Sequence, residues 1–303
     1  MQGFARVAID SRVSALDRPF DYAIPERMLG RVGAGSVVRV VLHGRNVRGF
    51  VTELLGEPAV AKPRAISSLV SPEPIFDEAM IKLASWIGRR YLVPLGIVLH
   101  DAVPGRFSAP DVSDAPTRRR PAARPAWLKD DPSKAIGTPK EFCAFPPTLA
   151  DEPELISYLA STAAASGLRT LVICPRVQIV ERVAEAIEGS VVLHGEDRPA
   201  QRAAAWAAAR DGMADVVVGG RSALLVPLPD LGLVIVASAH DPSLKSERSP
   251  RVHALVVARQ RARLAGATFV ASSPAPPVEI AAADDISWIT SKRSSVRPEV
   301  ARP

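Results

Sequence analysis

Short runs of alternating apolar and polar residues dominate the first part of the chain. ARVAI at residues 5–9 and FDYAIP at 20–25 have the alternation of strands, and a glycine turn at 33–35 leads into SVVRVVLHG. The segment RGFVTE at 48–53 is typical of the returning strand of a hairpin. Short strands separated by glycines predict a small β-barrel or curled sheet over residues 1–72.

The hydrophobic period changes to that of a helix after this region. Apolar residues from Met80 to Tyr91 recur every three or four positions, with Asp77 near the start and two arginines near the end. Pro94 ends this helix, and we expect a second short helix after it. Together with the strands, these helices predict a first domain over residues 1–105.

Residues 106–140 have little periodicity and are rich in Pro, Ala, Arg and Asp, with RRRPAARP at 118–125. This composition predicts a mobile basic linker. Its positive charge is suited to following phosphates, and a solvated tether explains it equally well.

Strands and helices alternate from residue 141 onward. LRTLVICP at 168–175 and LGLVIVASA at 231–239 are buried-strand runs, and amphipathic or alanine-rich helical segments separate such runs. This pattern predicts a parallel sheet covered by helices on both faces over residues 141–290. The chain as a whole is therefore predicted to be α/β, and residues 291–303 are predicted to form a disordered tail.

Composition narrows the class of protein only moderately. The chain has 303 residues, 38 Lys and Arg against 32 Asp and Glu, and a net charge of +6. That balance is compatible with a polyanionic partner, and also with an ordinary solvated surface. Cys143 and Cys174 lie in no C-x-x-C motif, which fits a reducing cytoplasm. We expect a soluble protein, because neither a signal peptide nor an apolar run of membrane-spanning length is visible.

The motifs that would carry chemistry in an α/β domain are missing. The chain contains no Gly-Lys dipeptide for a phosphate loop and no G-x-G-x-x-G. GGRSAL at 219–224 places Ser222 after a strand, but Leu224 stands where a nucleophile elbow needs its second glycine, which disfavours a serine hydrolase. Arg221 and Ser222 are candidate phosphate contacts, with capping or ion pairing as equally good explanations. The histidines form no H-x-x-x-H pair, so no metal site is predicted.

Several stretches, in collinear order, resemble the PriA family of primosomal replication-restart proteins, which are superfamily 2 DNA helicases. RPFDYAIPERM, VVRVVLHGRNVRGFV and LASWIGRRYLVPLGIVLHDAVPG resemble its N-terminal 3′-end-binding domain. VICPRVQIVERV, VVLHGEDRPAQRAAAWAAARDG and HDPSLKSERSPRVHALVVA resemble segments of its first helicase lobe. The resemblance covers nearly all of residues 4–280. It implies a barrel-like DNA-binding domain followed by a RecA-like lobe.

The resemblance assigns binding of a DNA 3′ end to Phe20, Asp21, Gly44 and Arg64. An aromatic face supports a base, a carboxylate accepts from a base edge or the terminal hydroxyl, and a cation neutralises the last phosphate. The residues by themselves also allow Phe20 and Tyr22 as core residues and Asp21 as a turn residue.

The resemblance fails at both centres of ATP hydrolysis. Where the family has its phosphate loop, after the strand around EFCAF, the chain reads AFPPTLADEPELIS. The acidic motif D-E-E-H aligns with Ala237, Ser238, Ala239 and His240. A triphosphate and its magnesium would lack charge compensation here, so we expect no catalytic residue and no bound ATP or magnesium. The family's second lobe and its zinc module have no counterpart in the sequence, so zinc is not expected either.

These observations lead to one main hypothesis. The chain is expected to bind branched or 3′-ended DNA at stalled replication forks and to promote primosome or replisome reloading without helicase activity. The resemblance also implies replisome-loading proteins or single-stranded-DNA-binding protein as partners, a nucleoid location, and roles in repair and recombination. Two alternatives stay open: an ATP-dependent 3′–5′ DNA helicase, and a truncated interaction scaffold.

Overall fold

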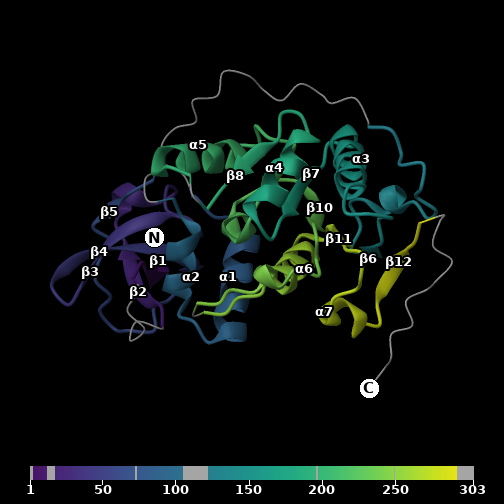
Figure 1. Cartoon of the computed structure of the whole chain (residues 1–303). Helices are drawn as coiled ribbons and strands as arrows, with labels where there is room; N and C mark the ends of the chain where they lie inside the picture. The colour runs from purple at the N-terminus through teal and green to yellow at the C-terminus, as the bar shows by residue number, and fades with distance from the viewer. Residues whose placement is uncertain are drawn as a thin grey trace. The chain divides into compact units, whose positions relative to one another are not determined.

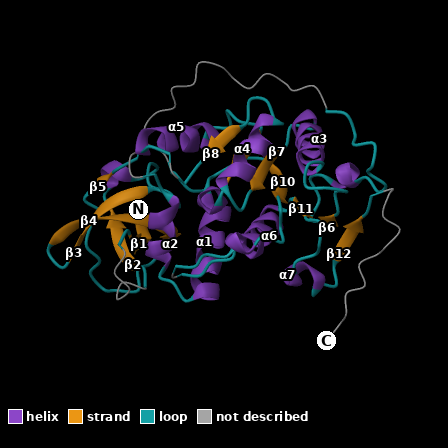
Figure 2. Cartoon of the chain, viewed as in Figure 1, coloured by secondary structure: helices purple, strands orange, loops and turns teal. Residues whose placement is uncertain are grey.

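The computed structural model describes residues 3–11, 18–71, 74–104, 122–195, 197–248 and 250–291. The chain divides into two compact units, Met1–Phe107 and Ser108–Pro303 (Figure 1). Strands and helices of both units are distinguished in Figure 2, and each unit is described by itself.

The first unit is built on a five-stranded sheet with the order β2-β1-β4-β3-β5 and antiparallel pairing throughout. Its alternating residues form one core, with Val7, Val38, Val40 and Val51 fully buried. The strands are β1 (Gly3–Ile9), β2 (Phe20–Ile24), β3 (Val37–Leu42), β4 (Arg45–Leu55) and β5 (Ser68–Leu69).

Two backbone hydrogen bonds join the outer edges of this sheet. The Ala23 N–H of β2 donates to the Arg64 carbonyl, and the Ile66 N–H donates to the Ala23 carbonyl, both at 2.9 Å. Residues 64–66 lead directly into β5, so these bonds close the sheet and satisfy backbone groups that an open edge would expose. The expected barrel-like fold is confirmed.

A tight turn at His43 and Gly44 connects β3 to β4. Both residues have positive φ, 46° and 79°, as a two-residue hairpin turn of the favoured twist requires. Glycine adopts this conformation without strain, which explains the glycine at position 44.

Helices α1 (Glu78–Tyr91) and α2 (Leu95–Ala102) complete the first unit, as the helical period predicts. Asp77 caps α1 by accepting a hydrogen bond from the Met80 N–H at 2.7 Å. On α2, His100 Nδ1 lies 2.5 Å from the buried carboxylate of Asp10, which also accepts a hydrogen bond from Arg48 of β4. These contacts fix α2 against the barrel.

The second unit contains a seven-stranded parallel sheet with the order β12-β6-β11-β10-β7-β9-β8. Its strands are β6 (Glu141–Ala144), β7 (Arg169–Ile173), β8 (Val191–Leu193), β9 (Val216–Gly219), β10 (Leu231–Val236), β11 (Thr268–Ser272) and β12 (Ile286–Ile289). Its helices are α3 (Glu152–Ala165), α4 (Val177–Glu185), α5 (Pro199–Arg210), α6 (Ala254–Ala265) and the short α7 (Val278–Ala281). The expected parallel α/β architecture is confirmed.

Helices cover both faces of the parallel sheet. α3 and α4 bury Leu155, Leu159 and Val183 against Val172 and Ile235 of the central strands. α6 lies on the opposite face (Figure 1), in contact with β10 and β11. Since every strand is parallel, all carboxyl ends lie along one edge of the sheet, where ligand sites of such folds are found.

The linker expected over residues 106–140 requires correction. Residues 105–121 lie outside the described part, but 122–140 pack onto the second unit. Leu128 is fully buried in the core beneath α3, and the Trp127 Nε1–H donates to Glu154 of α3 at 3.3 Å. The Tyr158 hydroxyl donates to Asp131 at 2.8 Å. Two apolar residues thus anchor a stretch whose proline and arginine content suggested a tether.

The end of the chain also differs from the expectation in part. β12 was not predicted, and it pairs in parallel with β6 from Ile286 to Ile289. The expected disordered tail, apart from Ser291, lies outside the described residues. No helix in the described part of the chain combines the length and apolarity needed to cross a bilayer.

Close packing of α2 on β1 at Gly96 gives a test of the first unit. A Cβ at Gly96 would lie 2.0 Å from the Ile9 carbonyl oxygen, whereas a Cβ at Gly56 would meet nothing within 4 Å. We predict that Gly96→Ala lowers the free energy of unfolding by about 1–3 kcal/mol, because the backbone must shift. Gly56→Ala should change it by less than about 0.5 kcal/mol. Urea unfolding of both variants checks this, and equal effects would contradict the packing described.

Candidate nucleic-acid interface

A cavity of about 840 Å³ opens on the first unit beside the strand β2. The residues that line it come from β1, from β2 and the two residues before it, from the end of β3 with its turn, and from the segment 59–64. Three of the four residues predicted for 3′-end binding, Phe20, Asp21 and Arg64, line this cavity together. Gly44 does not line it, and its part is to form the turn that places His43 at the rim.

Asp21 is held by the protein from two directions. Arg6 Nε donates to Asp21 Oδ1 at 3.0 Å, and the Ala59 N–H donates to Oδ2 at 2.8 Å. Burial raises the pKa of Asp21, but the Arg6 hydrogen bond, the Ala59 hydrogen bond and the Arg6 charge outweigh it and hold that pKa below its usual range. The side chain is only 5% exposed, so Asp21 first of all fixes the wall of the cavity.

Arg6 is the partner that the sequence analysis missed. It lies directly opposite Asp21 in the β1–β2 register, and it also pairs with Glu53 of β4 at 3.1 Å. The hydrogen bond to Asp21 raises the pKa of Arg6. An arginine across an antiparallel pair is a usual partner for a carboxylate, but it becomes visible only once the strand register is known.

The remaining charge around the cavity is positive. Lys62 and Arg64 are exposed, and no carboxylate among the described residues lies within ion-pair distance of either side chain. The Arg18 guanidinium lies 6.0 Å from the centre of the Phe20 ring. A half-buried aromatic ring beside unneutralised cations can support a base and attract a phosphate.

Tyr22 is a core residue that also lines the cavity. Its ring is buried among the barrel residues, and its hydroxyl donates to the Val41 carbonyl at 3.2 Å. Burial raises the pKa of Tyr22. The core position that the sequence left open therefore holds for Tyr22 and in part for Phe20, which packs half-buried against the same core, and both residues line the cavity.

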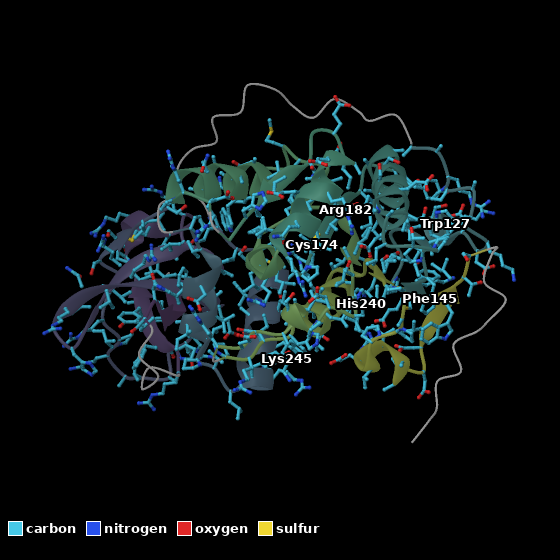
Figure 3. The ribbon with its side chains drawn as sticks, in the orientation of Figure 1. Trp127, Phe145, Cys174, Arg182, His240 and Lys245 are labelled. Atoms are coloured by element: carbon cyan, nitrogen blue, oxygen red, sulfur yellow. The ribbon has the colours of Figure 1, made fainter. Side chains whose placement is uncertain are left out.

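The four residues aligned with the acidic motif follow β10 in the second unit. Ala237, Ser238 and Ala239 are buried, and only His240 is exposed. His240 Nδ1 lies 3.0 Å from the Ser273 hydroxyl, which itself donates to the Ala275 carbonyl. His240 is labelled in Figure 3.

The candidate phosphate contacts lie on the turn after β9. Arg221 is exposed and donates to the Ser243 carbonyl at 2.6 Å, and Ser222 is exposed. The buried Arg261 of α6 holds this turn by donating to the carbonyls of Ala223, Leu224 and Val226.

No hydrogen bond links Ser222 to His240 in the described part of the chain, so the pair that a serine hydrolase needs is not formed there.

The first unit matches a known domain family, and most of the chain is similar to known proteins. Residues 6–104 match the PriA 3′ DNA-binding domain family (3′BD). The probable replication restart protein PriA of Mycobacterium tuberculosis (strain CDC 1551 / Oshkosh) is 32% identical over 277 residues, covering 84% of this chain and 41% of that protein. The replication restart protein PriA of Treponema pallidum (strain Nichols) is 29% identical over 303 residues, covering 93% of this chain and 45% of that protein. The chain is a PriA-like protein.

The PriA-like chain spans less than half the length of these relatives. Among solved structures, the helicase domain of Pyrococcus furiosus Hef aligns with a TM-score of 0.39 and 17% identity, over 52% of this chain and 36% of that one.

The ion pair at the cavity wall of this PriA-like protein predicts a pH dependence. Because the pKa of Asp21 is lowered on folding, its contribution to stability is present above its unfolded pKa of about 3.9 and is lost as pH falls through the folded value. We predict that wild type is more stable than Asp21→Asn at neutral pH and that this difference shrinks below about pH 4. Thermal unfolding of both proteins between acidic and neutral pH measures it. A difference independent of pH would show that the pair does not stabilise the fold.

Proposed function

We propose that this chain binds the 3′ end of a DNA strand in the cavity of its first unit. The observation that carries the proposal is the joint placement of Phe20, Asp21 and Arg64 on one cavity, inside the region that matches the 3′ DNA-binding domain family. The ring of Phe20 offers a stacking surface for a terminal base. Arg64 and Lys62 offer charge for the adjacent phosphates.

The role of Asp21 follows from its hydrogen bonds. Its two oxygens already accept from Arg6 and Ala59, yet each carboxylate oxygen can accept more than one hydrogen bond. A terminal 3′-hydroxyl is a donor and suits such an acceptor. A terminal phosphate carries negative charge and would be repelled by the same carboxylate, so the cavity is proposed to select a free 3′-hydroxyl.

The broader proposal concerns replication forks. A protein that recognises a free 3′ end beside duplex DNA would mark forks whose leading strand has stopped, and would there promote replisome reloading. The similarity to replication restart proteins supports this role, together with fork DNA, replisome-loading proteins and single-stranded-DNA-binding protein as partners. We propose that the chain does so without ATP-driven unwinding, since both ATP motifs are altered.

End selection is the first test of this proposal. We predict that the purified chain binds a model fork with a leading-strand 3′-hydroxyl roughly tenfold more tightly than the same fork with a 3′-phosphate, equal to about 1.4 kcal/mol. Fluorescence anisotropy at fixed salt measures both affinities. Equal affinities would rule out recognition of the 3′ end in this cavity, even if overall DNA binding were strong.

Arg64 gives a second test that separates the cavity from general charge. We predict that Arg64→Ala weakens fork binding most strongly at low salt and lowers the slope of log affinity against log salt by about one, because one phosphate contact is lost. The matched control is Arg31→Ala, which removes an exposed arginine of the same unit that does not line the cavity. If both variants changed affinity and slope alike, the cavity would have no special part in binding.

A further inference from the structure

A buried carboxylate lies at the start of α3, in the second unit. Glu152 is the first residue of that helix and has no exposed surface. Its Oε1 accepts a hydrogen bond from the Ser238 N–H at 2.7 Å, and its Oε2 accepts one from the Ser238 hydroxyl at 2.9 Å. One residue at the end of β10 therefore engages both oxygens of the carboxylate.

Positive charge is directed at the same carboxylate. Arg182 of α4 has its Nη2 atom 3.6 Å from Glu152 Oε2, and its buried Nε and Nη2 atoms have no hydrogen-bond partner among the described residues. The N-terminus of α3 adds its helix dipole. Burial raises the pKa of Cys174, the nearby Glu152 charge raises it further, and Arg182 opposes both. Arg182 and Cys174 are labelled in Figure 3.

These groups form the kind of cradle that α/β proteins use for anions. A helix N-terminus, a backbone N–H, a hydroxyl and a guanidinium converge at the carboxyl edge of a parallel sheet. In this chain the anion at that point is the protein's own carboxylate.

The loop before α3 has little left to offer an external anion. Pro146 and Pro147 of the loop, and Pro153 in the first turn of α3, have no N–H groups. The N–H of Thr148 donates to Asp151, and the N–H of Ala150 donates to the Thr148 hydroxyl. A phosphate loop instead needs free N–H groups that converge on the phosphates.

Glu152 and Ser238 come from the two segments that align with the family's ATP motifs. Glu152 lies in the segment that replaces the phosphate loop, and Ser238 lies in the one that replaces the acidic motif. In P-loop NTPases the phosphate loop and the acidic motif hold a magnesium ion between them. Here a carboxylate from one segment accepts two hydrogen bonds from a serine of the other, so the residues present do not fit a nucleoside triphosphate.

We propose that Glu152 is a built-in anion that takes the place of a nucleotide phosphate and closes this site. The inference rests on one part of the proposed function, the absence of ATP-driven unwinding. It is independent of the other part, DNA-end binding by the first unit. The closed contact ties the start of α3 to the end of β10 and to α4.

The backbone of Ser238 supports this assignment. Its φ is +46°, a left-handed conformation that costs free energy in a non-glycine residue. The structure retains that conformation where it aims the Ser238 N–H at Glu152 Oε1. The carboxylate contact offsets the strain.

The test is chemical rescue of a cavity variant. In Glu152→Ala the cradle loses its anion while Ser238 and Arg182 remain, so we expect a lower melting temperature that inorganic phosphate restores by several degrees relative to chloride at equal ionic strength. Wild type should show only the smaller, general stabilisation that phosphate gives as an excluded salt, and no shift with Mg-ATP. The matched control is Glu152→Gln, which removes the charge but fills the space, and should be destabilised without rescue.

Each outcome decides the proposal. A phosphate effect in wild type as large as in Glu152→Ala, or no rescue of Glu152→Ala beyond that of Glu152→Gln, would overturn it. If Glu152→Ala does not fold, equilibrium dialysis of Mg-ATP against wild type decides instead, since saturable binding contradicts a closed site and its absence supports one.

Fork binding measured on the same preparations keeps the two proposals apart. Glu152→Gln should retain fork affinity within about twofold, because the cavity of the first unit is unchanged. Failure of phosphate rescue with an intact 3′-hydroxyl preference would remove only this inference. Loss of that preference in wild type, with rescue intact, would remove only the proposed function.

Discussion

The arrangement around Glu152 depends on one physical constraint: a carboxylate with no exposed surface must be compensated. The loss of hydration costs on the order of several kcal/mol, and it is recovered only with good hydrogen bonds and a nearby cation. Ser238 supplies two hydrogen bonds and Arg182 supplies the cation. The compensating groups come from the end of β10 and from α4, so the packing of three elements is coupled through one side chain.

Much of the fold could be predicted because its signals are local. The alternation of each strand from β1 to β4, and the helical period of α1, can be recognised within a short stretch of sequence. The closure of the barrel was harder, since it joins Ala23 to residues 64–66 through backbone bonds that leave no side-chain pattern. β12 is only four residues long, and Leu128 lies in a stretch whose overall composition suggests a tether.

The candidate sites also depend on contacts between residues far apart in sequence, which no local pattern predicts. Resemblance brought Phe20, Asp21 and Arg64 together, but it did not indicate that Arg6 pairs with Asp21 across the β1–β2 register. Glu152 could not be recognised as special from its position at a helix start, where acidic residues are common. Its partner Ser238 lies 86 positions away in sequence, and only the folded sheet brings the two together.

The two units differ in whether their positively charged groups are paired with an anion of the protein itself. Around the cavity of the first unit, Asp21 is satisfied by Arg6, which leaves Lys62 and Arg64 available to an external polyanion. At the sheet edge of the second unit, an internal carboxylate instead accepts hydrogen bonds from both Ser238 donors and lies within ion-pair distance of Arg182. A cationic site attracts phosphate only while its charge is unneutralised. We therefore propose that phosphate recognition by the described residues lies at the cavity beside Phe20, where a nucleic-acid end would also find an aromatic surface.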